Sequence, residues 1–126
     1  MKQYEVKDLL DFPSGRLMFI LDEAKHEINS IMEDLTESTN LYESLKAMLP
    51  HKLAVIQTEF LDSGYSRNEA LDRAKASESY EKQLIDLSNA KNKKTALEFK
   101  FEACTLTIKA ITSITYLKNT ELKQGL

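Results

Sequence analysis

The sequence predicts an all-α fold, a small bundle of long antiparallel helices, and three observations support that prediction. The chain of 126 residues contains only 3 Gly and 2 Pro, so it has few residues that favour turns. Apolar side chains recur at alternating steps of four and three residues in the N-terminal half, and again in the C-terminal half. A chain of this length supports one domain with a modest core, so we expect residues 1–126 to form a single helical domain.

The first apolar series keeps one face of a helix apolar for about nine turns, and such a stripe needs a partner of similar length. The second series is the best partner within the chain, which predicts a long-helix hairpin. The polar stretch 36–40 leaves open whether residues 16–49 form one helix or two. The first series is Leu17, Leu21, Ala24, Ile28, Ile31, Leu35, Ser38, Tyr42, Leu45 and Leu49, and the second is Tyr80, Leu84, Leu87, Ala90, Leu97, Phe101, Cys104, Ile108 and Ile111.

Helix-breaking and capping residues divide the chain into four expected helices after a short lead in residues 1–12. Pro50 suits the first position of a helix, and Gly64 suits the position just after a helix end. Ser66 and Glu69 have the spacing of a capping box, and Ser77 offers a point of restart. We therefore expect helices over about residues 16–48, 50–62, 67–76 and 78–120.

The C-terminal segment 104–117 is rich in Thr and Ile, a composition typical of a β-strand. We predict a helix there, because the 4-3 spacing continues and no second convincing strand exists to pair with it. Apolar residues also occur on other sides of this helix, which indicates burial on more than one face. We expect the protein to form a homo-oligomer through the C-terminal helix, with Phe99, Leu106, Ala110 and Ile114 at the interface.

Charge is unevenly distributed along the chain. Residues 1–63 contain 6 Lys/Arg and 12 Asp/Glu, whereas residues 64–126 contain 11 Lys/Arg and 8 Asp/Glu. Either the two halves attract each other, or the basic half binds an anion. No signal-peptide pattern and no stretch able to span a membrane is evident, and the single Cys104 has no partner for an internal disulfide. These features predict a cytoplasmic protein without a membrane contact.

Metal-binding motifs are weak. Glu23 and His26 have the Glu-x-x-His spacing of di-iron helical bundles, but such a site needs a second pair and two more carboxylates. His51 has no Glu three residues before it. We predict no metal site and no cofactor, with His26 on the surface.

Catalytic motifs are equally weak. The pairs Glu69–Asp72 and Glu78–Glu81 resemble the Mg²⁺ motifs of all-α nucleotide pyrophosphohydrolases, but in reversed order and too close together. Cys104 lies on the apolar stripe, where a buried thiol without cationic neighbours is unreactive. The chain is therefore expected not to be an enzyme, and a helical nucleotide hydrolase ranks third among the function hypotheses.

Four basic residues gather around the capping region and are the candidate nucleic-acid-binding residues. Tyr65 flanks them and offers an aromatic ring for base stacking. Acidic residues between these cations reduce the local positive charge, and neutralising pairs along a helix are the simpler explanation. The four candidates are Lys52, Arg67, Arg73 and Lys75.

Several short segments in residues 50–118 resemble the phage recombination mediators of the UvsY type. They are Asp62-Ser63-Gly64, then Leu71-Asp72-Arg73-Ala74-Lys75-Ala76-Ser77-Glu78-Ser79, and Leu87-Ser88-Asn89-Ala90. The resemblance implies a helical, ring-like oligomer that binds single-stranded DNA, displaces single-strand-binding protein and loads a recombinase. Lys52, Arg73 and Lys75 match basic positions of that family. The segment 53–59 departs from it, because it lacks the cations that would neutralise phosphates.

Two functions are therefore expected. The first is a phage or mobile-element accessory protein of DNA recombination in the bacterial cytoplasm, a mediator that binds single-stranded DNA, with a recombinase and single-strand-binding protein as partners. The alternative is a helical protein–protein adaptor, chaperone or phage-encoded inhibitor of a host system, which requires only the apolar stripes and the acidic first half.

Overall fold

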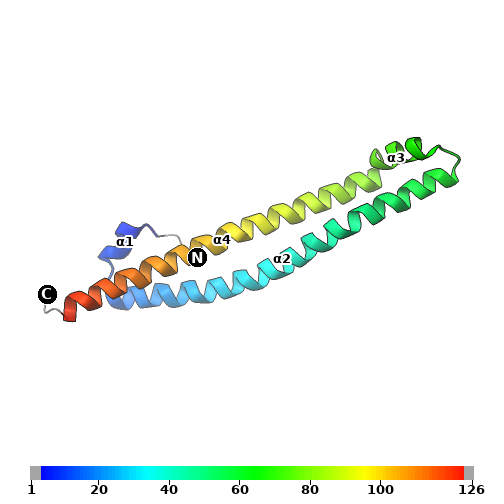
Figure 1. The fold of residues 1–126 in the computed structure, drawn as a ribbon. Coiled ribbons are helices and arrows are strands. Elements are labelled where there is room, and N and C mark those ends of the chain that lie inside the picture. Colours follow the sequence, from blue (N-terminus) through cyan, green and yellow to red (C-terminus); the bar gives the residue numbers. More distant parts are fainter. Residues whose placement is uncertain (1–3, 124–126) are drawn as a thin grey trace. The chain divides into compact units, whose positions relative to one another are not determined.

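The structure, a computed structural model, describes residues 4–123 and consists of four α-helices in that range (Figure 1). They are α1 (Val6–Asp11), α2 (Ser14–Asp62), α3 (Arg67–Lys75) and α4 (Glu78–Lys123). The described residues contain no strand, and α2 and α4 pack against each other, so the predicted all-α class is confirmed.

Helix α2 corrects the expected division into helices over 16–48 and 50–62. It runs unbroken from Ser14 to Asp62, with Pro50 inside it. Proline lacks the amide hydrogen that would bond to the carbonyl of Lys46, so one hydrogen bond of the helix is missing there. The Pro50 ring lies on an exposed side. The apolar spacing on both sides of the proline outweighs this local defect, because both parts bury the same face of the helix.

The Thr-rich part of α4 is helical, as predicted, and its hydroxyl groups explain why the strand-like composition is tolerated. Thr105, Thr107 and Thr112 each donate a hydrogen bond to the carbonyl four residues earlier, at 2.9, 3.1 and 2.8 Å. A threonine that bonds to its own helix hides its polar group and presents a methyl group to its surroundings.

The turn after α2 has the local structure that its residues predict. Gly64 has a φ of +99°, a conformation that favours glycine. The amide of Tyr65 donates to the carbonyl of Phe60, and the amide of Gly64 donates to that of Leu61, at 3.2 and 3.0 Å. This is the Schellman pattern, completed by an edge-on contact of the Phe60 and Tyr65 rings at 5.9 Å.

Serine caps begin the next two helices near the predicted positions. The Ser66 side chain accepts a hydrogen bond from the Glu69 amide, at 3.3 Å. The Ser77 hydroxyl accepts one from the Tyr80 amide at 3.2 Å, and it donates to the carbonyl of Ala74 at 2.7 Å. These bonds satisfy amide groups that a helix start leaves without partners.

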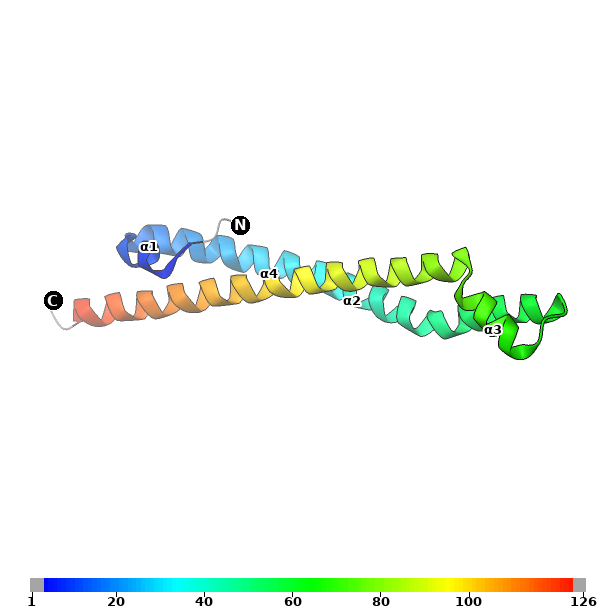
Figure 2. The same cartoon turned by 90° about the horizontal axis from the view of Figure 1, so that it is seen from above.

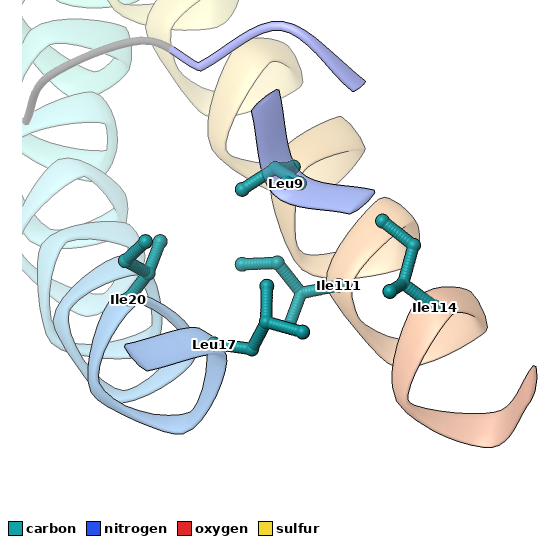
Figure 3. Close-up of a cluster of buried hydrophobic side chains, with 5 residues drawn as sticks. All are labelled: Leu9, Leu17, Ile20, Ile111 and Ile114. Carbon is teal, nitrogen blue, oxygen red and sulfur yellow. The ribbon is translucent and has the colours of Figure 1, made fainter. Parts of the chain in front are cut away.

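The chain divides into two compact units, and the expectation of a single helical domain stays a prediction. The first unit contains Met1–Leu35 and Leu97–Leu126, and the second contains Thr36–Ala96. In the first unit, α1 lies beside the start of α2 and the end of α4 (Figure 2). Its core brings together side chains from all three helices, which are Leu9, Leu17, Ile20, Ile111 and Ile114 (Figure 3).

The second unit packs α3 through small residues and includes polar groups between its long helices. Ala70 and Ala74 of α3 are completely buried. Ser38 is also buried, and the Lys94 ammonium lies 5.2 Å from the centroid of the Tyr42 ring. Short side chains allow α3 to approach its neighbours closely.

The two predicted apolar series differ in how well they match the buried faces. Every member of the first series is buried or half-buried. In the second series, Leu84 is 42% exposed, whereas Gln83 and Lys94 are half-buried at the inward 4-3 positions. The 4-3 spacing of inward-facing residues therefore continues without a gap through the basic stretch 91–94. Lysine tolerates this position because its stem packs while its ammonium contacts an aromatic face.

Candidate binding surfaces

An open groove of about 750 Å³ lies between α2 and α4 in the first unit. We call it the acidic groove. Apolar side chains lie at its base and edge, and charged or polar side chains line its wall. The lining residues are Phe19, Asp22, Glu23, His26, Glu27, Ser30, Ile31, Asp34, Leu97 and Lys100.

The acidic groove combines an apolar base with a negative wall. Ile31 and Leu97 are only 6% and 8% exposed, whereas Phe19 at the edge is 69% exposed. Four carboxylates face one lysine, so the lining residues carry a net charge of −3 with His26 neutral. Such a surface favours cationic, amphipathic ligands, because apolar contact and charge attraction act together.

The wall of the acidic groove follows from helical spacing in α2. Asp22, His26 and Ser30 recur every four residues, as do Glu23, Glu27 and Ile31, so they share one side of the helix. His26 is exposed, as predicted for a surface histidine. In the described residues, no group of three His, Cys, Asp or Glu side chains is arranged to hold a metal ion.

Cys104 lies in the interior of the same unit, where it is 4% exposed. Burial raises the pKa of its thiol above the ordinary value of 9.0, and the nearby charge of Glu27 raises it further. The thiol therefore stays protonated at neutral pH and serves as a small core side chain.

The predicted nucleic-acid-binding residues all lie in the second unit. Arg67, Arg73 and Lys75 are exposed on α3, whereas Lys52 is half-buried on α2. The carbonyl of Arg67 accepts a hydrogen bond from the Gln57 side chain at 3.4 Å, which ties the start of α3 to α2. The Arg73 guanidinium carbon lies 4.1 Å from the centroid of the Tyr65 ring.

These cations do not form one face of α3. Each residue turns a helix by about 100°, so Arg73 lies on one side of the buried Ala70–Ala74 stripe, and Arg67 and Lys75 lie on the other. The side facing away from that stripe carries Glu69 and Asp72 together with Lys75, all exposed. Carboxylates there repel phosphate groups, so α3 is less suited to nucleic acid than its cation content predicts.

The predicted oligomer-interface residues occupy different environments in the first unit. Phe99 and Leu106 are 67% and 59% exposed, and Ala110 is half-buried against the core. Ile114, in contrast, is 4% exposed and belongs to the core cluster with Leu9 (Figure 3). The outer face of α4 therefore includes the first three residues, whereas Ile114 is covered by α1.

Sequence reasoning missed the acidic groove, although part of its signal is present. The spacing of Glu23, Glu27 and Asp34 identifies an acidic side of a helix, but such sides are usually solvated. Only the pairing of α2 with α4 adds the apolar base and Lys100.

None of the helices in residues 4–123 has a stretch sufficiently long and apolar to cross a membrane. Comparison with protein-family models, with curated proteins and with solved structures found no match to this chain.

Proposed function

We propose that this protein is a helical protein–protein interaction module whose acidic groove binds a basic, amphipathic helix of a partner. The observation that carries the proposal is the joint presence of an apolar base, an exposed phenylalanine and four carboxylates in one groove of the first unit. This combination corresponds to the helix-in-groove mode of recognition, in which apolar anchors enter a groove and charges around it select the partner.

The dimensions of the groove fit such a ligand. Its lining on α2 extends from Phe19 to Asp34, a length of roughly 22 Å at the rise of an α-helix. A partner helix of about four turns covers that length. Because the wall charge is −3, cationic residues beside the partner's apolar anchors speed association and select against acidic helices.

The proposal is tested with a 15-residue amphipathic probe peptide of lysine, leucine and alanine, labelled for fluorescence anisotropy. We expect saturable binding that weakens as salt increases, and little binding of the same peptide with glutamate in place of lysine. A variant carrying Asp22→Asn, Glu23→Gln and Asp34→Asn should lose most of the affinity.

A matched control carries Glu33→Gln, Glu37→Gln and Glu43→Gln, three exposed residues of α2 outside the groove lining. It has the same net charge as the test variant, so it separates the groove from general attraction. Equal loss of affinity in both variants would contradict the proposal.

A second candidate function is the recombination mediator, which binds single-stranded DNA and has a recombinase and single-strand-binding protein as partners in the bacterial cytoplasm. The Tyr65–Arg73 pair supports it, because an aromatic ring beside a guanidinium group is an element of base-stacking sites. Neither candidate function involves catalysis.

Anisotropy of a labelled oligothymidylate at low and moderate salt tests this second candidate. Salt-sensitive binding that is lost in the combined variant Lys52→Gln, Arg67→Gln, Arg73→Gln and Lys75→Gln would support it. Absence of binding at micromolar protein, together with binding of the basic peptide, would leave the interaction module as the function.

A further inference from the structure

The outer face of α4 in the first unit carries a second apolar series, of which only Ala110 packs against the core. Its members are separated by alternating steps of four and three residues, as in a coiled-coil seam. Large and small residues alternate along it, and the two large ones are more than half exposed. The series is Phe99, Ala103, Leu106 and Ala110.

Helix α1 forms one side of this face. A cavity of about 230 Å³ lies between the two helices and is lined by Val6 and Leu9 of α1 and by Ala103, Leu106 and Ala110 of α4. Val6 is 59% exposed, so it adds apolar area beside the series. The other side of the series carries two exposed residues of opposite charge, Glu102 and Lys109.

We infer that this face binds the same face of a second copy of the chain, with the two α4 helices antiparallel. Glu102 and Lys109 are seven residues apart and hold equivalent positions of the heptad. In an antiparallel pair related by a twofold axis, such positions face each other, so Glu102 of each copy meets the partner's Lys109. One twofold contact therefore forms two ion pairs.

The same register matches side-chain sizes. When Glu102 faces the partner's Lys109, Leu106 packs against the partner's Ala103, and Phe99 packs against the partner's Ala110. Each large residue thus meets an alanine, which allows close approach of the helices without a cavity. Lys100 faces the partner's Thr107, so no like charges meet on the α1 side.

Two neighbouring registers lie one heptad away. The first pairs Glu102 with the partner's Glu102 while Phe99 still meets an alanine, so like charge disfavours it. The second is worse in both charge and size. It would pair Lys109 with the partner's Lys109 and Phe99 with the partner's Leu117. Like charges placed directly opposite are unfavourable, and two large residues would separate the helices. Charge complementarity thus selects this register, size complementarity is satisfied in it, and the occupant of this face is a second copy.

Sedimentation equilibrium of the full chain tests the inference. The expected mass is twice the 14.4 kDa of one chain. Leu106→Asp should yield the monomer, and because Leu106 is exposed, its helicity by circular dichroism should stay unchanged. Phe19→Asp, at a residue just as exposed but in the acidic groove, should leave the dimer intact. If the wild-type chain is a dimer but does not bind the basic peptide, only the proposed function fails. If it binds the peptide but is a monomer, only this inference fails.

Charge reversal tests the register. Glu102→Lys and Lys109→Glu each place like charges at two symmetric contacts, so each should weaken dimerisation roughly tenfold. The double variant should restore it. An unchanged dimer affinity in both single variants, or no recovery of dimer affinity in the double variant, would overturn the register.

A thiol cross-linker tests the direction of the helices. Glu102→Cys and Lys109→Cys should cross-link with each other through a short bismaleimide when the two variants are mixed, and neither should cross-link with itself. Self-cross-linking of each variant would indicate parallel helices. A monomeric wild-type chain, or a ring of higher mass, would refute the inferred dimer.

Discussion

The guanidinium carbon of Arg73 lies 4.1 Å from the centroid of the Tyr65 ring, and the same ring meets Phe60 edge-on at 5.9 Å. Tyr65 thus joins the last turn of α2 to α3. The ring reaches both neighbours because the turn before it reverses the chain at Gly64, where φ is +99°. The contact between the Arg73 guanidinium and the Tyr65 ring therefore depends on the backbone conformation of Gly64.

Gly64→Ala should therefore destabilise the protein. An alanine Cβ at this position would have no atom within 4 Å, so it would not clash with neighbouring residues. The loss of stability comes from the backbone conformation, which alanine rarely adopts. We expect a loss of about 1 to 2 kcal/mol in the free energy of unfolding, measured by urea titration. Gly15→Ala is the matched control, because it also meets no atom but lies in a helix with ordinary φ. It should raise stability by about 0.5 kcal/mol, and equal effects of the two changes would contradict this account.

Pro50→Ala should stabilise the protein. The substitution restores the amide that bonds to the carbonyl of Lys46 and removes a ring from the interior of α2. The expected gain is about 1 to 3 kcal/mol in urea titration. Ala54→Pro, at an exposed position one turn later in the same helix, should cost about 3 kcal/mol. If Pro50→Ala were neutral, the surrounding helix would already compensate for the missing hydrogen bond.

Local signals in the sequence predicted much of the fold. Gly64, Ser66 and Ser77 act at the helix ends expected of them, because each satisfies hydrogen bonds within a few residues of itself. Pro50 misled the prediction, because its local preference for a helix start competes with burial of one continuous face. Burial of a long apolar stripe stabilises the helix by more than one lost hydrogen bond destabilises it. The extent of that burial is known only when the partner helix is in place.

The candidate surfaces were less predictable, since they depend on the pairing of distant segments. Leu97 and Lys100 enter the acidic groove only through the pairing of α4 with α2. Ile114 was predicted to lie at the interface because α4 has apolar residues on more than one side. The six-residue helix α1 covers it with Leu9, and so short a segment has too few positions to reveal its buried face.

Thr115→Val should stabilise the first unit. Among the described residues, the Thr115 hydroxyl is a buried polar group without a hydrogen-bond partner. Replacing it with a methyl group of similar size removes that penalty, with an expected gain of about 1 kcal/mol in urea titration. Thr112→Val is the control, because the exposed Thr112 hydroxyl bonds to the carbonyl of Ile108 at 2.8 Å. It should change stability by less than about 0.5 kcal/mol, and a gain as large as that of Thr115→Val would contradict the prediction.

Cys104 should make stability decline at alkaline pH. Burial, and then the charge of Glu27, raise the pKa of its thiol above 9.0 in the folded chain, whereas the unfolded chain keeps the ordinary value. Above that ordinary value the unfolded chain has already released the proton that the folded chain retains, so rising pH favours unfolding. The stability due to the protonated thiol is fully present below pH 9.0 and is lost as pH rises toward the folded-state pKa.

The measurement compares urea titrations of the wild type and Cys104→Ala from neutral pH to above pH 9.0. The wild type should lose more stability than the variant over the alkaline part of that range, and the two should behave in parallel below it. The native thiol should also react slowly with Ellman's reagent and quickly once urea unfolds the chain, because access and ionisation both require unfolding. Rapid labelling of the folded protein would show that the thiol is accessible and ionised, and the predicted difference in pH dependence would then disappear.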